Sequence, residues 1–170
     1  MNQKRFAIAL AAASALFAAS SALAQQATQV AVHDAWRVFE LGSGGSKSCF
    51  MSSAPTQSSG AEGRRRGPVN LYVSNRPSDG VRDEVSVAIG YQFKPDAAAI
   101  EVAGRTYRLF TDGETAWSDG ADAKLVEEMK AGSTLVVRAT SSRGTDTRDT
   151  FSLRGFTAAN GALQRACRVP

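Results

Sequence analysis

Apolar and polar residues alternate with a two-residue period along most of this chain, a pattern typical of β-strands that bury one face. Glycine, proline, aspartate and asparagine separate the alternating segments, as expected at turns. The pattern predicts about eight or nine short strands, with ranges 35–41, 48–53, 69–75, 84–93, 99–102, 106–110, a short one that ends at Trp117, 133–141 and 149–156. The segments at 99–102 and 106–110 are predicted to form a hairpin around Gly104.

The period changes to that of a helix in two places. Over 120–131, the apolar residues Leu125, Val126 and Met129 fall on one face. Asp119 is predicted to cap the start of this helix, and Gly132 to end it in a left-handed conformation.

The second predicted helix covers 158–167, with Thr157 as its N-cap. Its apolar stripe consists of Ala159, Ala162, Leu163, Ala166 and Cys167. The polar residues Asn160, Gln164 and Arg168 fall on the opposite face, so Cys167 is expected to point inward.

These elements do not follow a β–α–β order, which excludes a predominantly parallel sheet. The fold class predicted is mainly β, an antiparallel β-sandwich or barrel-like domain with two short helices packed at one end. Residues 35–170 are expected to form this single domain. The polar segment 25–34 is expected to be loose.

Residues 1–24 have the features of a cleaved signal peptide. Lys4 and Arg5 precede an apolar stretch, and Ala22-Leu23-Ala24 supplies the small residues of a cleavage site. A membrane anchor is the alternative, but the stretch is short and rich in alanine. If this segment is cleaved, we expect a periplasmic or secreted protein without a transmembrane segment. Removal of Lys4 and Arg5 lowers the formal charge from +4 to +2.

The chain has two cysteines, Cys49 and Cys167. Export places them where disulfides persist, and only one intramolecular pairing exists. Two free thiols or an intermolecular bridge are the alternatives. An internal bridge would join an early strand to the last helix.

Arg64, Arg65 and Arg66 form the strongest charge feature, in a long polar loop. This loop is a candidate site for an anionic ligand, such as lipopolysaccharide, phospholipid or an acidic glycan. Solvated loop charge is the alternative, because most charge runs remain in water. Three arginines without interleaved aromatic residues do not indicate nucleic-acid binding.

No catalytic or metal-binding pattern is present in the sequence. His33 is the single histidine, so a Ser-His-Asp or Cys-His site has little support. Ser152 and Gly155 do not match a nucleophile elbow, since Phe151 precedes the serine. The acidic residues at 112–122 lack the spacing of a calcium loop, and turns and a helix cap explain them. We expect no cofactor, no metal site and no enzymatic activity.

The segment from Arg108 to Leu153 and the final motif "SLRGF" resemble the invasion-associated locus B family of exported bacterial proteins. "SCFMSSAP" and "LYVSNRP" earlier in the chain resemble the same family. The similarity runs from Trp36 to Cys167. It implies a small, exported, β-rich protein and supplies neither catalytic residues nor a cofactor. Many members of that family have additional cysteines in mid-chain.

These observations favour a non-catalytic envelope or secreted protein that binds an unidentified protein, glycan or anionic envelope component. Its role would be in host interaction or as an accessory of the cell envelope. A cryptic periplasmic hydrolase or carbohydrate-processing enzyme is one alternative, and a periplasmic stress or folding accessory is another.

Overall fold

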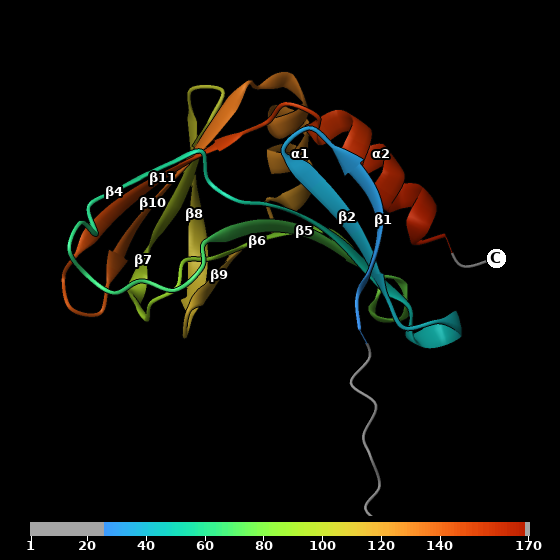
Figure 1. Ribbon diagram of the computed structural model, residues 1–170, viewed down its shortest axis with the longest axis horizontal. Helices are drawn as coiled ribbons and strands as arrows, with labels where there is room; N and C mark the ends of the chain where they lie inside the picture. The colour runs from blue at the N-terminus through green and yellow to red at the C-terminus, as the bar shows by residue number, and fades with distance from the viewer. Residues whose placement is uncertain (1–25, 169–170) are drawn as a thin grey trace, which may run out of the picture.

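A strongly bent antiparallel sheet forms most of the molecule (Figure 1). The computed structural model describes residues 26–168, so the predicted signal peptide at 1–24 lies outside the described residues. In Figure 1 the sheet bends into an arch, with β4, β11, β10 and β7 on one side and β1, β2 and α2 on the other.

The sheet has eleven strands in the order β1-β2-β3-β5-β6-β9-β8-β7-β10-β11-β4. Their bounds are β1 Thr28–His33, β2 Trp36–Leu41, β3 Ser48–Ser53, β4 Gln57–Ser59, β5 Asn70–Arg76, β6 Val81–Ala88, β7 Phe93–Val102, β8 Arg105–Asp112, β9 Thr115–Ser118, β10 Thr134–Ser141 and β11 Asp146–Ser152. The helices are α1, Asp122–Ala131, and α2, Phe156–Ala166. Short 3-10 turns cover Gly44–Ser46 and Pro77–Asp79.

The mainly β, antiparallel class is confirmed, with two helices near the predicted positions. The strand count is larger than the eight or nine predicted, and all eleven strands belong to one sheet that does not close. Its two halves nevertheless approach each other. The Trp36 indole N–H donates a hydrogen bond of 3.1 Å to the Ser152 carbonyl, which joins β2 to the end of β11.

The expectation that residues 25–34 are loose is wrong for Thr28–His33, which form β1 and pair with β2. A bulge between Gln29 and Ala31 shifts the register of the pairing, and the two valines of the strand, Val30 and Val32, face solvent. The predicted loop after β3 contains a second additional strand, β4, which pairs with β11.

Both helices begin at residues other than those predicted. Ala121 occupies the N-cap of α1 instead of Asp119, and the left-handed Gly155 occupies the N-cap of α2 instead of Thr157. Gly132 is extended after α1, with φ of −84°, and not left-handed as expected. A Cβ on Gly155 would overlap the His33 carbonyl, so the close approach of β1 requires glycine at this position.

One hydrophobic core fills the inner face of the sheet and the buried faces of the helices. Leu125, Val126 and Met129 of α1 are buried, as predicted from their spacing. The α2 helix buries Phe156 against Trp36, with ring centroids 5.0 Å apart in an edge-to-face arrangement.

The structure contains the disulfide between Cys49 of β3 and Cys167, the residue that follows α2. The two Cα atoms lie 5.7 Å apart across 118 residues of sequence, and both side chains are buried. The bridge therefore joins the end of the chain to an early strand of the sheet.

Replacing both cysteines by serine (C49S with C167S) is expected to lower the free energy of unfolding by about 2–4 kcal/mol, because the bridge restricts the unfolded chain. Urea denaturation of the oxidised protein measures this difference, and the wild-type protein in reductant is the matched control. An unchanged unfolding free energy, or two alkylated thiols in the unreduced exported protein, would contradict the assignment.

Candidate functional site

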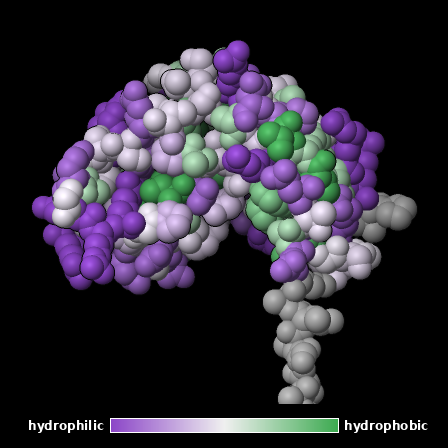
Figure 2. All heavy atoms as spheres, in the orientation of Figure 1, coloured by the Kyte–Doolittle hydropathy of each residue, from purple (hydrophilic) through white to green (hydrophobic). Residues whose placement is uncertain are grey.

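A basic cleft with a volume of about 900 Å³ lies between the loop that follows β4 and the β10–β11 hairpin. It is lined by residues of 61–66, Tyr91, Gln92 and residues 141–145. Among these lining residues four are arginines, namely Arg64, Arg65, Arg66 and Arg143, and none is acidic. Figure 2 shows hydrophilic residues gathered at this end of the molecule. We call this feature the basic cleft.

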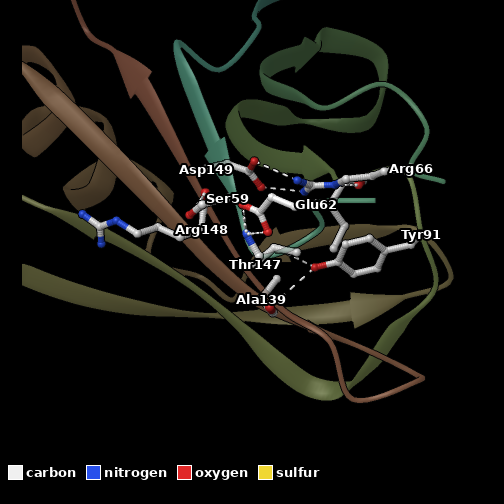
Figure 3. Close-up of polar contacts among 10 residues, drawn as sticks. Ser59, Glu62, Arg66, Tyr91, Ala139, Thr147, Arg148 and Asp149 are labelled. Atoms are coloured by element: carbon white, nitrogen blue, oxygen red, sulfur yellow. Dashed lines mark hydrogen bonds and ion pairs between the residues drawn. The ribbon is translucent and has the colours of Figure 1, made fainter. Parts of the chain in front are cut away.

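Arg66 anchors the loop to the sheet and is largely withdrawn from solvent. Its guanidinium donates two parallel hydrogen bonds to the Asp149 carboxylate, of 2.8 and 2.6 Å (Figure 3). A third, from Nε to the Ile89 carbonyl, measures 2.7 Å. The Arg66 side chain is 10% exposed and that of Asp149 is fully buried. A buried charge needs such a complete set of partners.

The ring of Tyr91 lies against the guanidinium of Arg66, with 5.1 Å between Cζ and the ring centroid. This is within the range of a cation–π contact. The Tyr91 hydroxyl is hydrogen-bonded to the Thr147 hydroxyl at 2.6 Å. Burial raises the pKa of Tyr91 above its usual value near 10, so the phenol is neutral at physiological pH.

Two glycines allow the loop to approach the sheet closely enough for this ion pair. The Gly67 N–H donates to the Gly90 carbonyl at 2.9 Å. Gly90 has a φ of +70°, and a Cβ there would overlap the backbone of Gly67. The residue next to Arg66 is therefore fixed against the end of β6.

Arg64, Arg65 and Arg143 are exposed, unlike Arg66. Within residues 26–168 none of the three forms a salt bridge with a carboxylate. Arg64 donates a hydrogen bond to the Thr145 hydroxyl, which links the loop to the hairpin. The basic cleft thus presents three guanidinium groups that form no salt bridge in the described part of the chain.

The acidic side chain within this loop, Glu62, is turned to its own backbone. The Glu62 carboxylate accepts hydrogen bonds of 2.9 and 3.0 Å from the Gly60 N–H. Backbone hydrogen bonds lower the pKa of Glu62, and the positive charge of Arg64 lowers it further. The carboxylate therefore stays ionised and bonded to the loop backbone.

The cleft offers guanidinium, hydroxyl, amide and neutral phenol groups. Arginine and hydroxyl donors suit the oxygens of phosphate, sulfate or carboxylate groups, which accept several hydrogen bonds each. A side chain that accepts protons near neutral pH is not among the lining residues.

The other residues weighed for chemistry lie elsewhere. His33 is in β1, opposite Trp36, and Ser152 accepts a hydrogen bond from the Arg154 N–H at the end of β11. Asp122 accepts hydrogen bonds from the Ser118 hydroxyl and the Val85 N–H, so it has a structural role at the start of α1. No group of three or more potential metal ligands occurs within the described part of the chain.

The sequence indicated the arginine loop but missed two features of the site. Arg66 was grouped with its neighbours, although its role is to pair with Asp149. Arg143 was assigned to a turn, and its position beside the loop depends on the pairing of β4 with β11. The exposed arginine at a hairpin tip was the available signal, but nothing in the sequence indicated which loop it would face.

Replacing Asp149 by asparagine (D149N) is expected to lower the free energy of unfolding by about 3 kcal/mol, because Arg66 would keep a buried charge without its partner. Chemical denaturation measures the loss. The combined change of D149N with R66M is expected to cost less than D149N alone, whereas the control R65S should stay within about 0.5 kcal/mol of wild type. Equal losses for D149N and R65S would contradict the anchoring role.

Comparison with known proteins gives a family assignment. The family model described as "Invasion associated locus B (IalB) protein" matches residues 36–164. No match was found among curated proteins or among solved structures. Among residues 26–168 no helix is both long and apolar enough to cross a membrane. The family match spans most of the chain, and the chain belongs to the invasion-associated locus B family.

Proposed function

We propose that this chain is a non-catalytic protein, exported to the periplasm or the medium, that uses the basic cleft to bind phosphate groups of an envelope component. Family membership and the β-rich fold support an exported protein of this kind. The observation that carries the proposal is the group of three exposed arginines, Arg64, Arg65 and Arg143, which two segments of the chain bring together and which form no salt bridge within residues 26–168.

The charge distribution in the cleft favours binding of an anion over simple solvation. The positive charge of Arg66 is neutralised by Asp149, so this arginine holds the loop in place. The remaining guanidinium groups lie on surfaces that Arg66 and the Arg64–Thr145 hydrogen bond hold together. Because the site is ordered before binding, less conformational entropy is lost when a ligand arrives.

Phosphate is the ligand group that best fits these donors. Arginine binds phosphate oxygens through two parallel N–H groups, and the serine and threonine hydroxyls around the hairpin can donate to further oxygens. Several phosphates at a membrane surface would engage the three arginines at once, which increases the attraction. Both an envelope accessory role and a role in host contact would use this binding step.

The two alternatives have less support from the cleft. A hydrolase or a carbohydrate-processing enzyme needs a positioned base or a pair of carboxylates, and the lining residues include neither histidine nor acid. A folding or stress accessory would be expected to present an apolar surface for unfolded chains, whereas this cleft is basic.

Replacing the three arginines by serine (R64S, R65S and R143S together) is expected to weaken binding to anionic vesicles by roughly a hundredfold at low salt, since each arginine near such a surface contributes about 1 kcal/mol. Sedimentation of the oxidised mature protein with phosphatidylglycerol vesicles measures this, with phosphatidylcholine vesicles as the neutral reference.

The matched control removes the same charge elsewhere, by the changes R82S, R105S and R154S. All three of these arginines are exposed, and none lines the basic cleft. The control should retain most of the binding. An equal loss in both variants would reduce the effect to net charge, and wild-type protein that fails to sediment with anionic vesicles would refute the proposal.

A further inference from the structure

A row of aromatic side chains crosses six neighbouring strands of the sheet, away from the basic cleft. We call it the aromatic row, and it consists of Phe39 of β2, Phe50 of β3, Tyr72 of β5, Trp117 of β9 and Phe110 of β8. The strand register aligns these residues. Phe39 is opposite Phe50, Ser86 of β6 stands opposite both Tyr72 and Trp117, and Trp117 is opposite Phe110.

Ring contacts connect the members of the row. The Phe39 and Phe50 rings stack with centroids 4.9 Å apart, and Phe50 meets Tyr72 edge-on at 6.2 Å. Beyond Ser86, the Phe110 and Trp117 centroids lie 6.4 Å apart. Six strands spaced at about 4.8 Å give the row a length of roughly 24 Å.

The row lies on the face of the sheet opposite the core. Its members alternate along their strands with fully buried core residues such as Val38, Met51 and Val73. Side chains of successive strand residues point to opposite faces, so the aromatic rings point away from the helices. Phe110 is 56% exposed, and the other four are partly exposed. Apolar clusters that reach the surface commonly mark interaction sites, and this row reaches it on both sides of the buried Ser86.

Polar groups accompany the rings. Ser52, Ser74 and Ser86 share this face in positions next to Tyr72 on the neighbouring strands or on β5 itself. The Tyr72 hydroxyl and the Trp117 indole N–H form no hydrogen bond within residues 26–168. Neither group is buried without a partner, so both reach solvent. Both groups are therefore available to a ligand, which is the usual value of tyrosine and tryptophan at binding surfaces.

Arginines stand near both ends of the row. Arg37 is two residues from Phe39, and Arg108 is two residues from Phe110, so each shares the face of its aromatic neighbour. Both are exposed, and within the described residues neither forms a salt bridge. Asp112 is the acidic residue beyond Phe110, at the end of β8. Arg37 gives the β2 end of the row a positive charge, and at the β8 end Arg108 and Asp112 stand on either side of Phe110.

We infer that the aromatic row binds a chain of an acidic glycan. Sugar rings present C–H groups that pack against aromatic side chains, and their hydroxyls can bond to Ser52, Ser74 and the polar groups of Tyr72 and Trp117. The carboxylates or other anionic substituents of the glycan would pair with Arg37 and Arg108. This inference goes beyond the proposed function, because it uses a different face and a different ligand chemistry from those of the basic cleft.

The composition of the face favours a glycan over a lipid surface. A surface that inserts into a membrane exposes leucine, phenylalanine and tryptophan next to a strongly basic side. Here the rings are interrupted by serines and by the Arg76–Glu84 ion pair, and the arginines without a carboxylate partner within the described residues, Arg37 and Arg108, lie toward the ends. A row of roughly 24 Å also fits an extended ligand better than a compact one.

The test uses affinity electrophoresis of the oxidised mature protein in gels that contain polygalacturonate, with dextran as the neutral polysaccharide. Wild-type protein should be retarded by polygalacturonate and much less by dextran. The single change F110A, at the most exposed position, and the change Y72A should each weaken the binding about tenfold, the usual cost of removing an aromatic anchor. R37Q with R108Q should remove the preference for the acidic polysaccharide.

Two controls make the result specific. The cleft variant with R64S, R65S and R143S should keep its retardation by polygalacturonate, and the urea midpoint of each variant should match wild type to show that it is folded. The inference is overturned if F110A and Y72A bind as wild type, if the cleft variant alone loses binding, or if wild type is not retarded. It is equally overturned if the aromatic changes abolish sedimentation with vesicles and leave polysaccharide binding unchanged.

Discussion

The buried ion pair between Arg66 and Asp149 determines where the long loop after β3 lies. Asp149 is fully buried in β11, a position that a carboxylate tolerates only with charged and hydrogen-bonding partners. Arg66 supplies both requirements through two parallel hydrogen bonds, and its Nε bonds to Ile89. The loop is thereby held to two distant parts of the sheet at once.

Other contacts along the same loop also hold it against the sheet. The Thr56 N–H donates to the Thr150 carbonyl at 2.7 Å, β4 pairs with β11, and Gly67 bonds to Gly90. With both ends fixed, the intervening arginines are placed beside the β10–β11 hairpin. The basic cleft is therefore a product of the long-range pairing of β4 with β11 and not of the arginine run alone.

The sequence predicted much of the fold because alternating segments such as 48–53 carry their own signal. The apolar face of α1 was also readable from spacing, and so was the apolar stripe of α2. The prediction that Asn160 lies on the opposite, polar face of α2 is wrong, because Asn160 is buried and donates a hydrogen bond to the Asp83 carboxylate. The strands that were missed have weak patterns: β1 contains a bulge, and β4 has three polar residues. The first residues of β11, 146–148, lie outside the predicted strand 149–156, since the inward side chain of Thr147 looks solvent-exposed until Tyr91 is placed against it.

The candidate sites also differ in whether a local sequence signal or a long-range contact determines them. Local composition revealed the arginine loop and suggested the Cys49–Cys167 pairing, because compartment and count restrict the choices. The aromatic row could not be found in this way, since its members come from five strands and are aligned by register. Helix starts were misjudged for a related reason. The start of α2 depends on the close approach of β1 to Gly155, a tertiary contact that capping preferences do not include.

The most direct test of the central claim is an amide NMR titration of the oxidised mature protein with inorganic phosphate or pyrophosphate. If the ion pair holds the loop and hairpin together as one anion site, the amides of residues 61–66, 91–92 and 141–145 should shift together, with a common dissociation constant. The D149N variant should lose this common behaviour, because its loop is no longer anchored. Shifts scattered over unrelated arginines, or a response of one segment without the other, would contradict the account.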